Sequence, residues 1–152
     1  MGANSQSSSS DRPFSYRRRV LWGDCDPENV IYTPRAFDYL MEALEAWSIE
    51  VIGLRWIQYR EVLKLGTPTV HTECDYLSVL RAGMVVDLTV RIERLGNSSM
   101  TFAVSMTGLD GTPHMRFKHT TCFITLNDFK AAPVPAEVRA KIEAYQAACG
   151  DA

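Results

Sequence analysis

The sequence predicts one α+β domain in which a long helix packs against an antiparallel sheet. Three observations lead to this fold class. The chain has 152 residues, about the length of a single domain. Apolar residues recur every three or four positions within 33–52, the period of an amphipathic helix, and alternate with polar residues within 84–106, the period of half-buried strands. A helix on one face of such a sheet is a complete two-layer fold.

The N-terminal part of the chain divides into a tail, a strand and a loop. Residues 1–12 are rich in serine and lack an apolar period, so we expect a disordered tail before a single domain at 13–150. A strand with one buried face is predicted next, from apolar residues at even positions: Phe14, Tyr16, Val20 and Trp22. Glycine, proline and aspartate within 22–29 then predict a loop.

The long helix is predicted to begin at Thr33, with Thr33 as the N-cap and Pro34 at the first helical position. Gly53 is a plausible stop. Alanines widen its apolar stripe, so we expect this helix to lie at the centre of the core. The connection over 54–66 has no clear period and is expected to be irregular.

The rest of the chain predicts a sheet followed by a helix. Thr67–Leu80 is rich in β-branched and aromatic residues, and the alternating segment at 84–106 predicts a hairpin that turns at Gly96–Ser99. The segments that follow are a turn, a strand and a helix, at Gly108–Pro113, Arg116–Leu126 and Ala136–Cys149. We therefore expect an antiparallel meander of about four strands. Its edge strands favour pairing with a second copy, most simply as a two-fold dimer.

Composition and charge argue against several classes of protein. Sixteen basic and eighteen acidic residues give a net charge of −2, so no overall attraction for nucleic acid or an anionic membrane is expected. No apolar stretch is long enough to span a bilayer or to serve as a secretion signal, and we expect a cytoplasmic protein. The four cysteines and three histidines lack metal-binding spacing, so we expect free thiols and no metal. No glycine-rich phosphate loop or serine-nucleophile motif is present.

One polar motif is the candidate site. Asp24-Cys25-Asp26-Pro27 stands directly before the predicted helix. The free N–H groups at a helix start carry partial positive charge, so a carboxylate beside them could work next to a ready-made oxyanion site. That arrangement suits acyl transfer. The alternative, which is the commoner one on pattern alone, is that either aspartate only shapes a turn.

The motif and its surroundings resemble a known family. Arg19–Pro27, followed by Val30–Pro34 and a long helix, is similar to the signature of hot-dog-fold acyl-CoA thioesterases of the 4-hydroxybenzoyl-CoA thioesterase type. Gly66–Pro68 and Leu95–Phe102 resemble further segments of that family, and the similarity runs from about Phe14 to Pro135. The resemblance implies a hot-dog fold, in which a curved antiparallel sheet wraps a long central helix. It also implies a homodimer or homotetramer with sites between subunits.

The resemblance further implies roles for individual residues. Asp26 corresponds to the catalytic carboxylate, acting as nucleophile or as general base on water, and the backbone N–H of Thr33 corresponds to the group that polarises the thioester carbonyl. Asp24 is expected to hold the loop. The implied reaction is hydrolysis of an acyl-CoA to an acid and CoA without a metal or redox cofactor. Family members commonly have glycine at the position of Asn29, so the loop geometry here is expected to differ.

Substrate contacts are less clearly indicated. Trp47, Trp56 and Tyr59 are candidates for the acyl pocket, with core packing as the commoner role for Trp47 and an equal alternative for the other two. Tyr32 is a further candidate for contact with the substrate. Basic side chains suit the phosphates of CoA, although a solvated strand charge is the commoner role for each of them: Arg91, Arg94, Arg116, Lys118 and His119. His71 and Glu73 could orient water, but a surface pairing role is the commoner one for such residues.

Two functions from different classes fit these features. The first is an acyl-CoA thioesterase, which the presence of Asp26 favours. The second is a non-hydrolytic module that binds acyl-CoA or acyl carrier protein on the same scaffold, because a fold does not fix a function. The acyl group, aromatic or aliphatic, is left open by the sequence.

Overall fold

The computed structural model describes residues 13–150, so the tail expected at 1–12 lies outside the described residues. The elements follow in chain order: β1 (Ser15–Arg19), the 3-10 turn η1 (Trp22–Asp24), α1 (Thr33–Trp47), the π-helical turn η2 (Ser48–Ile52), α2 (Trp56–Glu61), β2 (Leu65–Gly66), β3 (Thr69–Tyr76), β4 (Val85–Leu95), β5 (Ser99–Gly108), β6 (Pro113–Cys122), β7 (Ile124–Thr125) and α3 (Ala136–Cys149). In this part of the chain every helix is too short or too polar to cross a bilayer.

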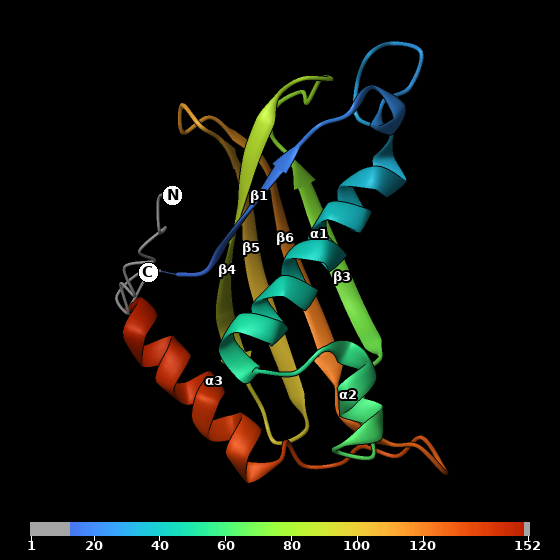
Figure 1. The fold of residues 1–152 in the computed structure, drawn as a ribbon, viewed down its shortest axis with the longest axis vertical. Coiled ribbons are helices and arrows are strands. Elements are labelled where there is room, and N and C mark those ends of the chain that lie inside the picture. The colour runs from blue at the N-terminus through green and yellow to red at the C-terminus, as the bar shows by residue number, and fades with distance from the viewer. Residues whose placement is uncertain (1–12, 151–152) are drawn as a thin grey trace, which may run out of the picture.

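A five-stranded antiparallel sheet, in the order β1-β4-β5-β6-β3, carries α1 on one face (Figure 1). The meander prediction is confirmed for β4, β5 and β6. It is wrong for β3, which pairs with β6 at the far edge instead of with β4. The connection after β3 crosses the end of the sheet, where Ile31 N–H donates to Leu80 O at 2.9 Å and Gly83 N–H to Val20 O at 2.8 Å. These hydrogen bonds hold the connection in place where it passes from one edge of the sheet to the other.

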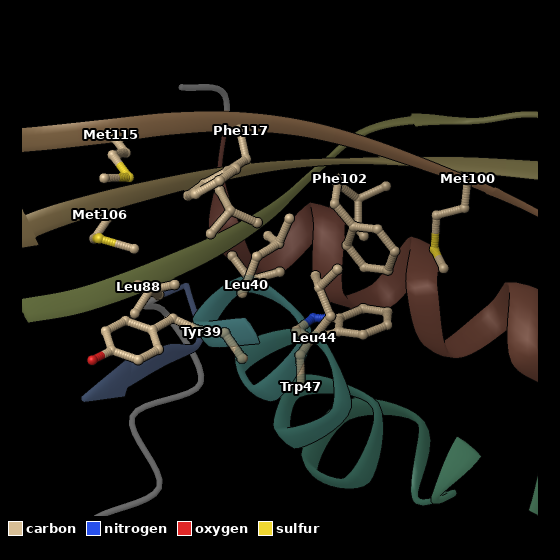
Figure 2. Close-up of a cluster of buried hydrophobic side chains, with 14 of the residues drawn as sticks. Tyr39, Leu40, Leu44, Trp47, Leu88, Met100, Phe102, Met106, Met115 and Phe117 are labelled. Atoms are coloured by element: carbon tan, nitrogen blue, oxygen red, sulfur yellow. The ribbon is translucent and has the colours of Figure 1, made fainter. Parts of the chain in front are cut away.

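The core lies between α1 and the inner face of the sheet. Buried and less buried residues alternate along β4 and β5, as the sequence pattern predicts. Figure 2 shows helix residues such as Leu40 and Trp47 facing Phe102 and Phe117 of the sheet. The rings of Trp47 and Phe102 meet edge to face, with centroids 5.0 Å apart. The long helix therefore occupies the centre of the core, as expected.

The ends of the helical segments differ from the prediction in two places. Tyr32 is the N-cap, in an extended conformation, and Thr33 is the first helical residue rather than the cap. Pro34 thereby takes the second helical position, where its missing N–H still costs no helix bond. The connection predicted to be irregular contains the helix α2, which is too short to show a period in sequence. Gly53, in the left-handed conformation with φ of 83°, ends the long helical segment as predicted.

Candidate functional site

The loop between β1 and α1 is folded back on itself by backbone hydrogen bonds. Asp26 N–H donates to Val30 O at 2.8 Å, and Asn29 N–H donates to Asp26 O at 3.0 Å. Asn29 has φ of 56°, a left-handed conformation that asparagine tolerates better than most residues. It can therefore serve at a position for which the family resemblance implied glycine. The turn fixes the direction of the Asp26 side chain.

The Asp26 carboxylate is anchored through one oxygen only. Oδ1 accepts the N–H groups of Glu28 at 2.9 Å and of Val30 at 3.2 Å. Oδ2 has no hydrogen-bond partner within residues 13–150, and the side chain is half-buried. The turn role and the catalytic role are thus compatible, because the bonds that shape the turn orient one oxygen and leave the other available.

Asp24 connects the same loop to the helix. Its Oδ2 accepts the hydroxyl of Tyr39 at 2.5 Å and the N–H of Leu21 at 3.0 Å, and Arg18 lies 3.9 Å away. Arg18 also stacks over the Tyr39 ring, 4.5 Å from its centroid. Burial alone raises the pKa of Asp24, but the hydrogen bonds from Tyr39 and Leu21 and the charge of Arg18 outweigh it and lower the pKa. Asp24 is therefore an ionised anchor between the loop and α1.

We expect Asp24→Asn to reduce the free energy of unfolding by about 1 to 3 kcal/mol at neutral pH, since a buried charge-assisted network loses its charge. The folded-state pKa lies below the unfolded value of about 3.9. The stabilisation is therefore complete above that value and is lost as pH falls through the folded-state pKa. Urea unfolding of both proteins should show a constant difference down to about pH 5 and a shrinking one below about pH 4. A difference that already shrinks between neutral pH and about pH 6 would contradict this assignment.

The start of α1 presents a free donor beside this loop. The N–H of Thr33 has no acceptor within residues 13–150, whereas Arg35 N–H donates to Tyr32 O at 2.8 Å. A bridge between Cys25 and Ile31 holds the two arms of the loop together, and Tyr32 N–H donates to Asp24 O at 2.8 Å. The structure thus brings Asp26 and Thr33 to the same end of α1, with Tyr32 exposed beside them.

A cavity lies toward the other end of α1. Its volume is about 260 Å³, and it is enclosed by the C-terminal half of α1, by α2 and by the inner faces of β5 and β6. Trp56 and Tyr59, both candidates for the acyl pocket, line it together. Because each residue of α1 rises about 1.5 Å, the cavity, which Met41 lines, begins roughly 12 Å along the helix from Thr33 in one copy of the chain.

The basic candidates for CoA binding are divided between two faces of the sheet. Arg91, Arg116 and Lys118 surround a hollow of about 300 Å³ on the outer face, and Arg94 stands further along β4. Lys118 Nζ lies 3.1 Å from Glu93, and the Arg91 guanidinium donates to the Cys149 carbonyl at 3.1 Å. None of these four lines the cavity.

His119 lies on the opposite, inner side of the sheet, away from the other basic candidates. It is 2% exposed, lines the cavity, and its ring nitrogens lie 2.9 Å from Thr72 Oγ1 and 3.3 Å from Thr69 Oγ1. Burial lowers the pKa of His119, so the ring offers no positive charge at neutral pH. The exposed pair of His71 and Glu73, 2.9 Å apart on β3, is a surface pair within one strand.

Sequence reasoning missed several residues that shape the site. Tyr39 fixes Asp24, and Ser48 joins Tyr59 in the cavity wall. The available signal was their position in the apolar stripe of the helix, because a polar group at a buried position needs a partner. Within residues 13–150, no three His, Cys, Asp or Glu side chains are placed to hold a metal ion.

The comparisons with known proteins decide the family. The model of the thioesterase-like superfamily matches residues 20–142. The chain belongs to this superfamily. A thioesterase superfamily structure from Jannaschia sp. CCS1 is 33% identical to this chain, with 88% of this chain and 92% of that chain covered and a TM-score of 0.80. None of the curated proteins compared with the sequence matches it.

Two structures with lower sequence identity share the fold of this chain. A 1,4-dihydroxy-2-naphthoyl-CoA thioesterase from Synechocystis is 22% identical, with 85% of this chain and 94% of that chain covered and a TM-score of 0.78. A Staphylococcus aureus protein in complex with CoA is 18% identical, with 93% and 89% covered and a TM-score of 0.87. The predicted hot-dog fold is confirmed.

Proposed function

We propose that this protein hydrolyses acyl-CoA thioesters, with Asp26 as the catalytic carboxylate and Thr33 N–H as the oxyanion donor. The observation that carries the proposal is the Asp26 carboxylate at the start of α1, which is oriented through Oδ1 and free at Oδ2. The assignment of CoA as the thiol part of the substrate is supported by the Staphylococcus aureus structure solved with CoA and by the Synechocystis relative named for a CoA thioester.

The reaction has two routes that use the same groups. In both, the thioester oxygen accepts the Thr33 N–H, which stabilises the negative charge that develops on it. Asp26 either attacks the carbonyl carbon, forming an anhydride that water then hydrolyses, or removes a proton from a water molecule that attacks. The C–S bond breaks in each route, the CoA thiolate leaves and is protonated, and the acid is released.

We propose further that a second copy completes the site. The outer edge of β3 is unpaired within residues 13–150, and the exposed apolar side chains at this edge and after it include Val70, Tyr76 and Val79. Two β3 strands that pair antiparallel place the Thr69 end of one beside the Tyr76 end of the other. The cavity lies at the Thr69 end, and the Asp26 loop bonds to the segment that follows Tyr76. The cavity of one subunit would then face Asp26 of the partner subunit.

For the phosphates of CoA we propose Arg94 and Arg116 ahead of Arg91 and Lys118. Neither Arg94 nor Arg116 has an ion pair in the described part of the chain, whereas Lys118 is paired with Glu93 and Arg91 is bonded to a backbone carbonyl. A free guanidinium binds phosphate without first breaking another contact. Tyr32, exposed next to Thr33, is proposed to contact the substrate near the thioester.

The function is tested with a panel of acyl-CoA thioesters and a thiol reagent that detects free CoA. The panel contains aromatic and aliphatic acyl groups, and each is assayed with wild-type protein. We expect turnover of at least one member without added metal or redox cofactor. Tight binding of acyl-CoA without release of thiol would instead support the non-hydrolytic binding module.

A further inference from the structure

Two hydroxyl groups in the cavity wall form a hydrogen-bond chain with one defined direction. Ser48 Oγ lies 2.8 Å from Leu54 O and 2.7 Å from Tyr59 Oη. A serine hydroxyl has one proton, and a carbonyl oxygen can only accept. Ser48 therefore donates to Leu54 O, and Tyr59 donates to Ser48. Both residues are at least nine-tenths buried, with exposed fractions of 1% and 5%.

This direction leaves an unused acceptor at Tyr59. Its only proton points to Ser48, and no donor reaches Oη within residues 13–150. Burial raises the pKa of Tyr59, so the group is a neutral phenol at neutral pH. The wall has two other buried polar side chains: His119 is engaged by Thr69 and Thr72, and the indole N–H of Trp47 has no hydrogen-bond partner within residues 13–150. Tyr59 Oη is thus an acceptor without a donor in a wall that is otherwise largely aromatic and aliphatic.

The volume of the cavity indicates the size of the group that it can hold. A cavity of about 150 Å³ holds benzene, so a volume of about 260 Å³ holds roughly ten carbon atoms. Resting on the thioesterase function proposed above, we propose that the preferred acyl group has about ten carbons or fewer and carries a hydroxyl remote from the thioester, which donates to Tyr59 Oη. Tyr59 is then a specificity-determining residue of the acyl site.

The test uses pairs of acyl-CoA thioesters with six, eight and ten carbons, each with and without a hydroxyl on the last carbon. The readout is the ratio of kcat/KM for the hydroxylated member to kcat/KM for its partner, in wild-type protein and in Tyr59→Phe. At the chain length that places the hydroxyl at Tyr59, we expect Tyr59→Phe to lower this ratio at least about tenfold, because the buried hydroxyl loses its acceptor.

Trp56→Phe is the matched control, because it trims a ring of the same wall without removing the acceptor. It should change kcat/KM for both members of each pair alike, so that the ratio stays within about twofold. A ratio that Tyr59→Phe leaves unchanged at all three chain lengths would overturn the inference. Melting curves of the variants are recorded to check that each is folded.

Binding separates this inference from the proposed hydrolysis. The dissociation constants of the same pairs are measured by calorimetry with Asp26→Asn, and again with Tyr59→Phe added. If wild-type protein hydrolyses no member but the ratio of dissociation constants depends on Tyr59, the hydrolytic function fails and the hydroxyl site stands. If hydrolysis occurs and neither ratio depends on Tyr59, the function stands and the hydroxyl site fails. Absence of binding by every pair would overturn both.

Discussion

Asp26→Asn is expected to lower turnover of the best acyl-CoA by at least about 100-fold while the protein still folds and binds substrate. An amide can neither attack the thioester carbon nor take a proton from water. Its oxygen can still accept the N–H groups of Glu28 and Val30, so the turn is retained. The comparison of Asp26→Asn with the wild type therefore tests the chemistry of Asp26 Oδ2 alone. Turnover is measured by thiol release, and substrate affinity by calorimetry.

The matched control is Glu28→Gln. Glu28 is an exposed carboxylate two residues further along the same loop, and its side chain has no assigned role. Loss of this carboxylate should leave turnover within about twofold of the wild-type value, as for surface substitutions away from a site. If Asp26→Asn instead kept more than about a tenth of wild-type turnover, Asp26 would be a turn residue only.

The double substitution of Val70→Lys and Tyr76→Lys is expected to give a folded monomer whose turnover is at least about 100-fold below that of the wild type. In antiparallel pairing of two β3 strands centred on Glu73, position 70 of one subunit faces position 76 of the partner. Four added lysines would therefore meet at the interface, where like charges oppose pairing. Without the partner, the Asp26 loop has no cavity opposite it. Sedimentation measures the oligomeric state, and the melting temperature shows that the subunit is folded.

The control for this variant carries the same added charge elsewhere. Leu109 and Phe129 are exposed apolar residues in other loops, 59% and 72% accessible, and lysine at both should leave the dimer and its turnover intact. A β3 variant that sediments as a monomer and keeps wild-type turnover would refute the shared site. A dimer unaffected by the lysines would place the interface elsewhere.

The elements that could be predicted from sequence are those with one buried face over many residues. The helix after Thr33 and the alternating strands β4 and β5 each bury such a face, so their period survives in the sequence. The place of β3 beside β6 could not be predicted, because it depends on how the connection after β3 crosses the sheet. The helix α2 has six residues, fewer than two turns, which is too short for a period to show.

The same contrast holds for the site. Asp26 and Thr33 lie seven residues apart in one motif, so local sequence was enough to name them. The cavity joins Ser48, Tyr59 and His119 from two helical segments and a strand, and only the folded chain shows that they meet. The direction of the Ser48–Tyr59 hydrogen bond depends on the carbonyl of Leu54, which carries no signal in the sequence.

The central claim, a thioester-hydrolysing site that joins Asp26 of one subunit to the cavity of its partner, is tested most directly by mixing two inactive variants. Asp26→Asn removes the carboxylate, and Thr121→Trp fills the cavity, which Thr121 lines. Refolding an equal mixture makes about half of the dimers mixed, and two-fold symmetry leaves each of these one intact site. The account predicts recovery of about a quarter of wild-type turnover. Turnover that stays at the level of the separate variants, with mixed dimers demonstrated by native mass spectrometry, would contradict it.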